Sequence, residues 1–412
     1  MRLLHTADWH LGQNFHGYSR QTEHQQFLDW LLDTLDRERI DVLLIAGDIF
    51  DTANPPAAAQ QQLYRFLCEA KRRRPGLQGV LVAGNHDSPG RLEVPVPFLD
   101  VMDVRVVGAV RREDGEIDPD SLIVPLRNTS GDTAAYCLAV PFLRPADVPR
   151  VETDGDAYLE GIRALYSQVT ERALALRQPG QALVALGHCH LVGGQESTES
   201  ERRLVIGGVE ALSASTFAPE LAYVGLGHLH LAQRVGEERI RYSGSPLPMS
   251  FSEIDYPHQV LVTELAGEAL ASVTPVRIPR FVPLLKVPAQ PAPPDAVLAE
   301  LTRADWPPCE PDQQPYLQVR VALERPEPGL RHRIEQALEG KGVRLVRIET
   351  VYPGKTDESG ERTDIPESAP ARLDPEDVFR RLWGKSWAGE PDAEVLAAFR
   401  DLLSSVGTEE AP

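Results

Sequence analysis

The chain has 412 residues, which is too long for one ordinary hydrophobic core and predicts two or three domains. With 42% hydrophobic and 25% charged residues it has the composition of a soluble globular protein, and no apolar run is long enough to span a membrane. The formal net charge of −19 disfavours nucleic-acid binding, which usually needs a basic patch, although bound divalent cations would add local positive charge.

The chain opens on a strand-like segment that ends with Asp8 and His10. Because these polar residues fall inside the first apolar segment, the start of the chain lacks the pattern of a secretory signal peptide. The 4 cysteines are scattered without a C-x-x-C pair, as in proteins of reducing compartments. We therefore predict a cytoplasmic protein.

Helical and strand-like patterns alternate over the next part of the chain. One amphipathic helix is predicted over residues 21–38, a buried strand over 42–46, a second helix over 55–74 and a further strand from residue 79. The basic run KRRR at 71–74 is explained by its place at a helix C-terminus, where cations interact favourably with the helix dipole. This β-α-β-α-β order predicts a layered sheet with helices outside.

Glycine followed by Asp, Asn or His punctuates the end of several of these strands. The pattern is clearest in DVLLIAGDIFD at 41–51, GVLVAGNHD at 79–87, ALVALGHCH at 182–190 and LAYVGLGHLH at 221–230. Glycine allows a sharp turn without a Cβ clash, so the next side chain can point into a crevice. A single such Asp is commonly a turn former or helix cap, and a single His is commonly a hydrogen-bonded residue. Five strand ends of this kind, counting the first strand, predict a metal centre.

Carboxylate, amide and imidazole groups are ligands that Mn²⁺ and similar ions accept. One ion of ordinary coordination does not need this many ligands, so we predict two adjacent ions that share Asp48 and activate a water between them. His190 competes with His188, because GHCH at 187–190 mimics GHLH at 227–230. Cys189 is a poor candidate, since a soft thiolate suits other metals. The predicted ligands are Asp8, His10, Asp48, Asn85, His188, His228 and His230.

The rest of the first 280 residues is less regular. Residues 92–150 read as strand-like pieces broken by Pro and Gly, and a helix is predicted over 157–176. Two short alternating runs, 239–242 and 259–265, surround the turn-rich segment SGSPLP at 243–248. These patterns complete the first predicted domain.

A change of composition near residue 281 predicts a second part of the chain. The proline-rich stretch 283–294 reads as an extended linker, and a strand at 316–323, a helix at 329–339 and a strand at 343–349 then form a small α/β module. A polar, flexible segment leads from there to two amphipathic helices at the end of the chain. The predicted boundaries are 1–280, 281–352, 353–373 and 374–412.

These motifs carry a family resemblance. DWH at 8–10, GDIFD at 47–51, GNHD at 84–87, GH at 187–188 and GHLH at 227–230 resemble the motifs of the calcineurin-like metallophosphoesterase superfamily. Within it, MRLLHTADWHLG at 1–12, the GDIFDT-to-NPP run at 47–56 and YSGSPLPMSFSE at 242–253 resemble the nuclease subunits of bacterial SbcCD complexes. The resemblance implies an α/β fold: a layered β-sandwich core with flanking helices, a small α/β capping domain and C-terminal partner-binding helices.

The resemblance also implies residue roles. One Mn²⁺ would be held by Asp8, His10, Asp48 and His230, and the second by Asp48, Asn85, His188 and His228. The same pattern favours His188 over His190 as the ligand. His86 would be a catalytic histidine that binds neither ion, with Asp51 orienting it; an imidazole, which titrates near neutral pH, suits proton donation to a leaving oxygen.

The implied function is a Mn²⁺-dependent DNA nuclease of repair, recombination and replication, with 3′–5′ exonuclease activity on duplex ends and endonuclease activity on hairpins and single strands. ATP would be consumed by a partner, an SbcC-type ABC ATPase bound through the C-terminal helices, and this chain indeed has no GxxxxGK[ST] loop. The C-terminal helices have the alternative of packing on their own domain. The resemblance further implies a homodimer within a heterotetramer, for which VPVPFLDVM at 94–102 is a candidate contact.

Other functions compete with this one. The metal ligands alone fit a phosphoprotein phosphatase or a small-molecule phosphodiesterase of the same superfamily equally well. A scaffold protein without activity is a third reading, which the complete ligand set disfavours. The residues after 281 favour the nuclease.

Overall fold

The central strands are apolar on both faces because each lies between two layers. In β4 (Val42–Ala46), Val42 and Leu44 point into one core, while Leu43 and Ile45 point into another. Such double burial explains why the strand reads as a continuous apolar run. The computed structural model describes residues 1–128, 130–197, 211–325 and 327–352, together with 379, 380, 383, 391, 392, 395, 396, 398 and 399.

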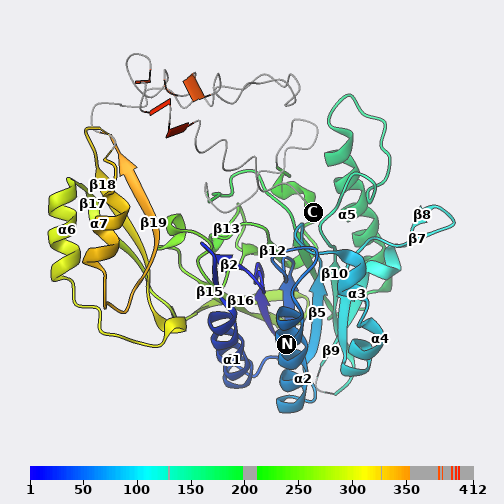
Figure 1. Ribbon diagram of the computed structural model, residues 1–412. Helices are drawn as coiled ribbons and strands as arrows, with labels where there is room; N and C mark the ends of the chain where they lie inside the picture. Colours follow the sequence, from blue (N-terminus) through cyan, green and yellow to red (C-terminus); the bar gives the residue numbers. More distant parts are fainter. Residues whose placement is uncertain are drawn as a thin grey trace, which may run out of the picture. The chain divides into compact units, whose positions relative to one another are not determined.

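Two six-stranded sheets form the sandwich (Figure 1). The first has the order β16-β15-β1-β4-β5-β6; β1, β4, β5 and β6 are parallel, whereas β15 and β16 run antiparallel to their neighbours. Its other strands are β1 (Arg2–Thr6), β5 (Gln78–Val82), β6 (Val104–Val107), β15 (Gln259–Ala266) and β16 (Ala269–Arg277).

The second sheet has the order β13-β14-β12-β11-β10-β9, with a parallel centre and an antiparallel strand at each edge. Its strands are β9 (Ile123–Arg127), β10 (Thr133–Ala139), β11 (Ala182–His188), β12 (Leu221–Gly227), β13 (Gln233–Arg234) and β14 (Ile240–Tyr242). The predicted layered β-sandwich with flanking helices is confirmed.

Hydrophobic side chains fix the layers. One core joins the two sheets, for example through Val80 and Val184. A second core lies between the first sheet and the helices α1 (Gln21–Arg37) and α2 (Ala57–Arg73). On the second sheet packs α5 (Ala157–Leu176). All three helices follow their predicted periodicity within a few residues.

The segment after β5 differs from its predicted strand-like character. It forms the short helices α3 (Pro89–Glu93) and α4 (Val96–Leu99), each with a proline in its first turn, where the missing N–H costs nothing. Two small hairpins also belong to the described part of the first 280 residues. They consist of β2 (Asn14–Phe15) with β3 (Tyr18–Ser19) and β7 (Arg112–Glu113) with β8 (Glu116–Ile117).

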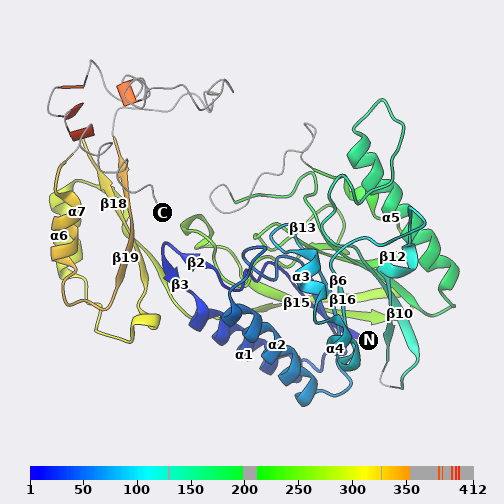
Figure 2. The same ribbon diagram turned by 45° about the vertical axis from the view of Figure 1, so that its right-hand side comes forward.

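Residues 281–352, called the cap module here, contain a three-stranded parallel sheet with the order β17-β18-β19. The helices α6 (Pro294–Arg303) and α7 (Leu330–Ala337) cover one face of it (Figure 2). The prediction of a linker at 283–294 was wrong: this stretch is the edge strand β17 and the start of α6. Prolines are tolerated at an edge because one side of the strand needs no hydrogen bonds. The strands are β17 (Leu284–Ala292), β18 (Tyr316–Ala322) and β19 (Arg344–Val351).

A separate aromatic cluster joins the cap module to the sandwich. Phe15 and Phe251 of the sandwich pack with Leu284 and Tyr316 of the cap, and all four are buried. Tyr316 has no solvent exposure, so the two parts share a continuous apolar contact.

The chain divides into two compact units, Met1–Pro353 and Gly354–Pro412. In the second unit, the ring of Phe379 stacks on that of Phe399, with centroids 4.2 Å apart, and Trp383 lies 5.9 Å from Phe379. The two predicted C-terminal segments therefore contact each other. The predicted flexible segment 353–373 lies outside the described residues.

Across the described parts of the chain, no helix combines the length and the apolar character that crossing a membrane requires.

Candidate metal centre

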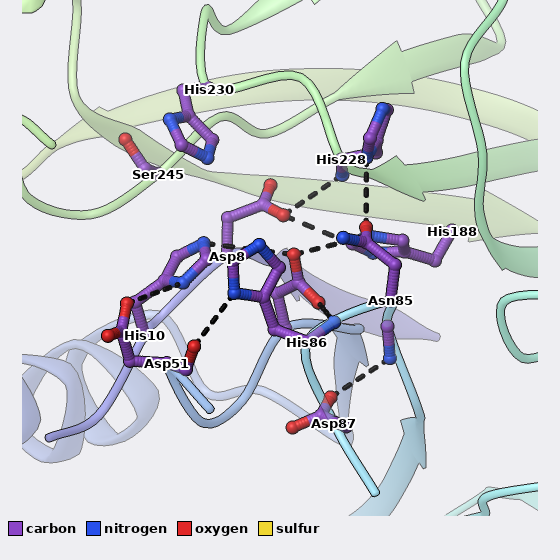
Figure 3. A network of polar contacts seen from close by, with 12 residues as sticks. Asp8, His10, Asp51, Asn85, His86, Asp87, His188, His228, His230 and Ser245 are labelled. Carbon is purple, nitrogen blue, oxygen red and sulfur yellow. Dashed lines mark hydrogen bonds and ion pairs between the residues drawn. The ribbon is translucent and has the colours of Figure 1, made fainter. Parts of the chain in front are cut away.

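The predicted ligands meet at one end of the sandwich, where strands of both sheets finish. β1, β4 and β5 of the first sheet and β11 and β12 of the second lead into them. Carboxyl ends of parallel strands open at the same edge of a sheet, and Figure 3 shows the side chains turned toward one another. The structure brings together all of the predicted ligands: Asp8, His10, Asp48, Asn85, His188, His228 and His230.

The backbone adopts left-handed conformations at several of these positions. Asp8, His10 and Asp48 have φ values of 54°, 46° and 46°, which cost roughly 1–3 kcal/mol each in residues other than glycine. Gly47, with φ of 84°, is required here: a Cβ on it would lie 2.3 Å from Nδ1 of His188. The tight turn predicted after β4 therefore carries Asp48 directly beside the second sheet.

Asp48 occupies the middle of the cluster. Its Oδ1 accepts a hydrogen bond of 2.8 Å from the main-chain N–H of His86. Its Oδ2 lies 3.4 Å from Nε2 of His188 and 3.8 Å from Nε2 of His10. A carboxylate in this position, between an imidazole that follows β1 and one that ends β11, could serve as a metal ligand.

Asn85 joins two histidines of the second sheet. Its Oδ1 lies 2.9 Å from Nε2 of His188 and 3.1 Å from Nδ1 of His228. Nδ1 of His188 contacts the main-chain oxygen of Ala46 at 2.9 Å, which fixes the ring and leaves Nε2 directed at the cluster. An amide oxygen and two imidazole nitrogens thus converge on one point.

Some buried polar atoms of the cluster, including one oxygen of Asp8, have no hydrogen-bond partner within the part of the chain that the structure describes. Oδ1 of Asp8 accepts the main-chain N–H of His228 at 2.9 Å. Its Oδ2, like Nε2 of His10, is buried without a hydrogen-bond partner among the described residues. Leaving such polar atoms unpaired costs about 1–3 kcal/mol each. Bound divalent cations would satisfy them, so the residues fit a metal centre.

Three overlapping groups of side chains have potential ligand atoms within 4.8 Å of one another. They are Asp8–His10–His230, Asp8–Asp48–His188 and His10–Asp48–His86. The overlap at Asp48 and Asp8 supports two neighbouring ion positions rather than one.

Burial and contacts between the side chains shift the pKa values of the cluster. Burial raises the pKa of Asp8 to about 7. Burial also opposes ionisation of Asp48, but the imidazoles of His188 and His10 outweigh it and hold the pKa of Asp48 below its usual range. Burial lowers the pKa of His188, yet the carboxylate of Asp48 more than compensates and brings it to about 9. Asp48 is therefore anionic at neutral pH, as a metal ligand must be.

His86 is held by the main chain of Asp51. Nδ1 of His86 lies 2.7 Å from the carbonyl oxygen of Asp51 and can donate a hydrogen bond to it. The carboxylate of Asp51 instead lies 3.3 Å from Nδ1 of His10. Asp51 therefore contacts His86 through its main chain and not through its carboxylate, and its role in orienting His86 stays a prediction.

Glu253 is a partner of the cluster that the sequence did not reveal. Its Oε1 lies 2.9 Å from Nδ1 of His230, and its Oε2 accepts the main-chain N–H of Met249 at 2.7 Å. A buried carboxylate behind a histidine fixes the ring and its tautomer. Glu253 ends the run YSGSPLPMSFSE at 242–253, but nothing local connects it to His230.

Asp87 is the second partner that was missed. Its carboxylate accepts main-chain N–H groups of Ile49, Phe50 and Gly84 at 2.9–3.1 Å, and so ties the turn after β4 to the turn after β5. Burial raises the pKa of Asp87 to about 6. The GNHD motif includes this position without indicating its role.

His190 contacts a carboxylate outside the cluster. Its Nδ1 lies 3.2 Å from Oε1 of Glu196, while His188 lies among Asp48, Asn85 and His228. This placement supports His188 as the ligand.

Comparison with known proteins agrees with this geometry. Residues 1–232 match the calcineurin-like phosphoesterase family, and residues 280–386 match the type 5 capsule protein repressor C-terminal domain. The chain is 40% identical over 405 residues to the SbcD subunit of the nuclease SbcCD of Rhodobacter capsulatus, covering 97% of this chain and 94% of the relative.

Two further relatives carry the same name. The protein of Bacillus subtilis strain 168 is 32% identical over 426 residues, with 100% of both chains covered. The protein of Escherichia coli K12 is 36% identical over 293 residues, which cover 69% of this chain and 70% of the relative. The chain therefore belongs to the calcineurin-like phosphoesterase family of metal-dependent hydrolases and, within it, to the SbcD nucleases.

Proposed function

We propose that the chain is a DNA nuclease that uses two Mn²⁺ ions, with 3′–5′ exonuclease activity on duplex ends and endonuclease activity on hairpins and single strands. The observation that carries this proposal is the position of Asp48 between His10 and His188, surrounded by carboxylate, amide and imidazole ligands. Oxygen and imidazole ligands without thiolates suit Mn²⁺. The names of the relatives support a nucleic-acid substrate.

The ligands divide into two sets. Asp8, His10, Asp48 and His230 would hold one ion, and Asp48, Asn85, His188 and His228 the other. When bound, such a pair supplies a nucleophile from water near neutral pH and stabilises phosphate oxygens. The unpaired Oδ2 of Asp8 and Nε2 of His10 support the first set.

His86 has the position of a proton donor. Its Nδ1 is engaged by the carbonyl oxygen of Asp51, so its Nε2 is the nitrogen left for the leaving oxygen of the substrate. Its main-chain N–H is held by Asp48, which keeps the ring at the edge of the cluster. General-acid catalysis of this kind contributes about 10²–10⁴-fold to a rate.

The parts after residue 280 serve partners in this proposal. Residues 281–352 act as a capping domain, 353–373 as a linker, and 374–412 bind an SbcC-type ABC ATPase. The relatives are named as subunits of an SbcCD nuclease, and this name supports such a partner. The stacked rings of Phe379 and Phe399 are consistent with a small helical unit that presents one joint surface.

A second copy of the chain would complete a homodimer within the heterotetramer. Val94, Phe98 and Val101 are 75%, 77% and 85% exposed. Val94 lies in the turn between α3 and α4, Phe98 in α4 and Val101 in the 3-10 turn that follows, so the three exposed apolar side chains come from one short segment. An exposed apolar stripe of this kind is typical of a protein contact.

The net charge of −19 raises the question of which groups would bind the DNA backbone. The basic run at the end of α2 is paired with acids: Lys71 with Asp103, Arg72 with Glu69, and Arg73 with Asp33. In this proposal the ions and the ATPase partner supply positive charge for DNA, because this basic run is already paired. We place the complex in the cytoplasm, with its chromosomal substrate.

Hydrolysis assays test the proposal. The wild-type chain with Mn²⁺ should cleave a phosphodiester such as bis-nitrophenyl phosphate, and a hairpin DNA with blocked ends in the presence of the ATPase partner. Asp48→Asn should lower both activities by more than about 10²-fold. The control is Asp132→Asn, which changes an exposed carboxylate directly before β10, at the opposite end of the sheet from His188. Preference for a phosphomonoester, or full activity of Asp48→Asn, would refute it.

A further inference from the structure

A buried ion pair at the start of α1 connects the cap module with the loop behind His230. The guanidinium of Arg20 has no exposed surface, and the carboxylate of Glu23 is 3% exposed. Nε and Nη2 of Arg20 donate to the two oxygens of Glu23 at 3.1 and 2.8 Å. Such a bidentate, desolvated pair fixes both side chains.

Glu23 is shared with the cap. Its Oε1 also accepts the hydroxyl of Tyr316 at 2.8 Å. The Tyr316 ring packs against Phe15, with centroids 4.8 Å apart, and under the guanidinium of Arg344 at 3.9 Å. Tyr316 is the first residue of β18, so any shift of the cap sheet moves this hydroxyl relative to Glu23.

Arg20 is connected to the metal centre through the loop at 248–253. Its Nη1 donates to the carbonyl oxygen of Pro248 at 2.7 Å. The next residue, Met249, donates its N–H to Glu253, whose other oxygen contacts Nδ1 of His230. The loop that Arg20 holds is therefore the loop that delivers Glu253 to His230.

We propose that Tyr316, Glu23 and Arg20 act as positioning residues, through which the docked cap holds Glu253 against His230 and keeps Nε2 of His230 directed at the ion. This inference rests on the proposed role of His230 as a metal ligand. None of the three residues belongs to the ligand set. Their effect passes through the loop at 248–253, and each link is a hydrogen bond between buried groups.

The test is a calorimetric titration of the metal-free, full-length chain with Mn²⁺. Tyr316→Phe removes one hydroxyl and keeps the ring. We expect a loss of about 3–30-fold in affinity at one of the two sites, below or near the 10–100-fold typical of direct partners of metal-bound histidines. The matched control is Thr22→Val, which removes a different 2.8 Å hydrogen bond between sandwich and cap, that to Asp312.

A double variant separates the inference from the assignment beneath it. His230→Gln should weaken one site on its own, and adding Tyr316→Phe to it should change nothing further. Equal affinities for Tyr316→Phe, Thr22→Val and wild type would overturn the positioning role while leaving the metal centre intact. Unchanged affinities for His230→Gln would overturn the ligand assignment itself. Thermal unfolding of the metal-free variants confirms that each is folded before titration.

Discussion

The side-chain oxygen of Asn85 lies 2.9 Å from Nε2 of His188, although Asn85 follows β5 of the first sheet and His188 ends β11 of the second. This contact joins the turn after β5 to the end of β11 at the metal centre. Both atoms are proposed ligands of the same ion.

Asn85→Ala should therefore remove one of the two bound ions. The amide oxygen has no substitute among its neighbours, since His188 and His228 already supply their ring nitrogens. Metal content after dialysis, measured by plasma mass spectrometry, should fall to about half that of the wild type. An unchanged content would remove Asn85 from the ligand set.

His86→Asn should abolish DNA cleavage and leave the metal content intact. Loss of a proton donor costs about 10²–10⁴-fold in rate. Single-turnover cleavage and metal analysis on the same preparation check both halves of this expectation. Loss of an ion in this variant would show that His86 is a ligand, as its position near His10 and Asp48 also allows.

Asp51→Asn should be much milder than His86→Asn. The hydrogen bond to His86 comes from the main-chain carbonyl of Asp51, which the substitution keeps. The lost carboxylate faces His10, so Mn²⁺ affinity should fall while the rate at saturating Mn²⁺ stays within a few-fold of wild type. A variant as inactive as His86→Asn at saturating metal would contradict the geometry.

The buried His5 predicts how stability depends on pH. Burial lowers the pKa of His5 from 6.5 to about 3, and its Nδ1 contacts the hydroxyl of Tyr223 at 2.8 Å. Below pH 6.5, His5 is protonated in the unfolded chain but stays neutral in the native chain. The free energy of unfolding therefore falls as the pH drops toward 3. His5→Gln keeps a hydrogen-bonding group and removes the titration.

Between about pH 6 and 4, the unfolding free energy of the metal-free His5→Gln variant should therefore fall less steeply than that of the metal-free wild type. The two slopes should differ by about 1.4 kcal/mol per pH unit. Urea denaturation at several pH values measures this difference in slope. Parallel curves for the variant and the wild type would mean that His5 is protonated in the native state.

Phe98→Lys should separate the proposed homodimer without unfolding it. Phe98 is 77% exposed, so the substitution removes little buried area from the monomer. Light scattering after gel filtration should report half the mass, with an unchanged melting temperature. Val192→Lys, at a residue 63% exposed elsewhere, is the control and should keep the dimer.

Deletion of residues 374–412 should abolish co-purification with the ATPase partner and spare Mn²⁺ binding. The metal centre and the deleted residues belong to different compact units. Continued co-purification of the shortened chain would place the docking surface elsewhere.

Much of the cluster was predictable because each proposed ligand lies at the end of a strand or within a few residues after it. Asp48, Asn85 and His188 can be recognised by the glycine that precedes each of them. The parallel strands then bring these strand ends together at one edge. Glu253 was not predictable, because its contact with His230 depends on how the loop after β14 folds back. The same holds for the pairing of Tyr316 with Glu23, which are 293 positions apart.

The fold too was predictable in some parts and not in others. Periodicity identified α1, α2 and α5, whose apolar faces repeat along one helix. The prolines of β17 were read as a linker, since the sequence does not tell that this strand lies at an edge. The helices α3 and α4 are too short for periodicity to reveal.

The carboxylate of Asp8 accepts the N–H of His228 across 220 positions of the chain. The proposed metal centre can consequently form only after more than half of the polypeptide has been synthesised. A translation product that ends before His228 would lack this contact and two of the proposed ligands, His228 and His230, and we expect it to be an inert hydrolase.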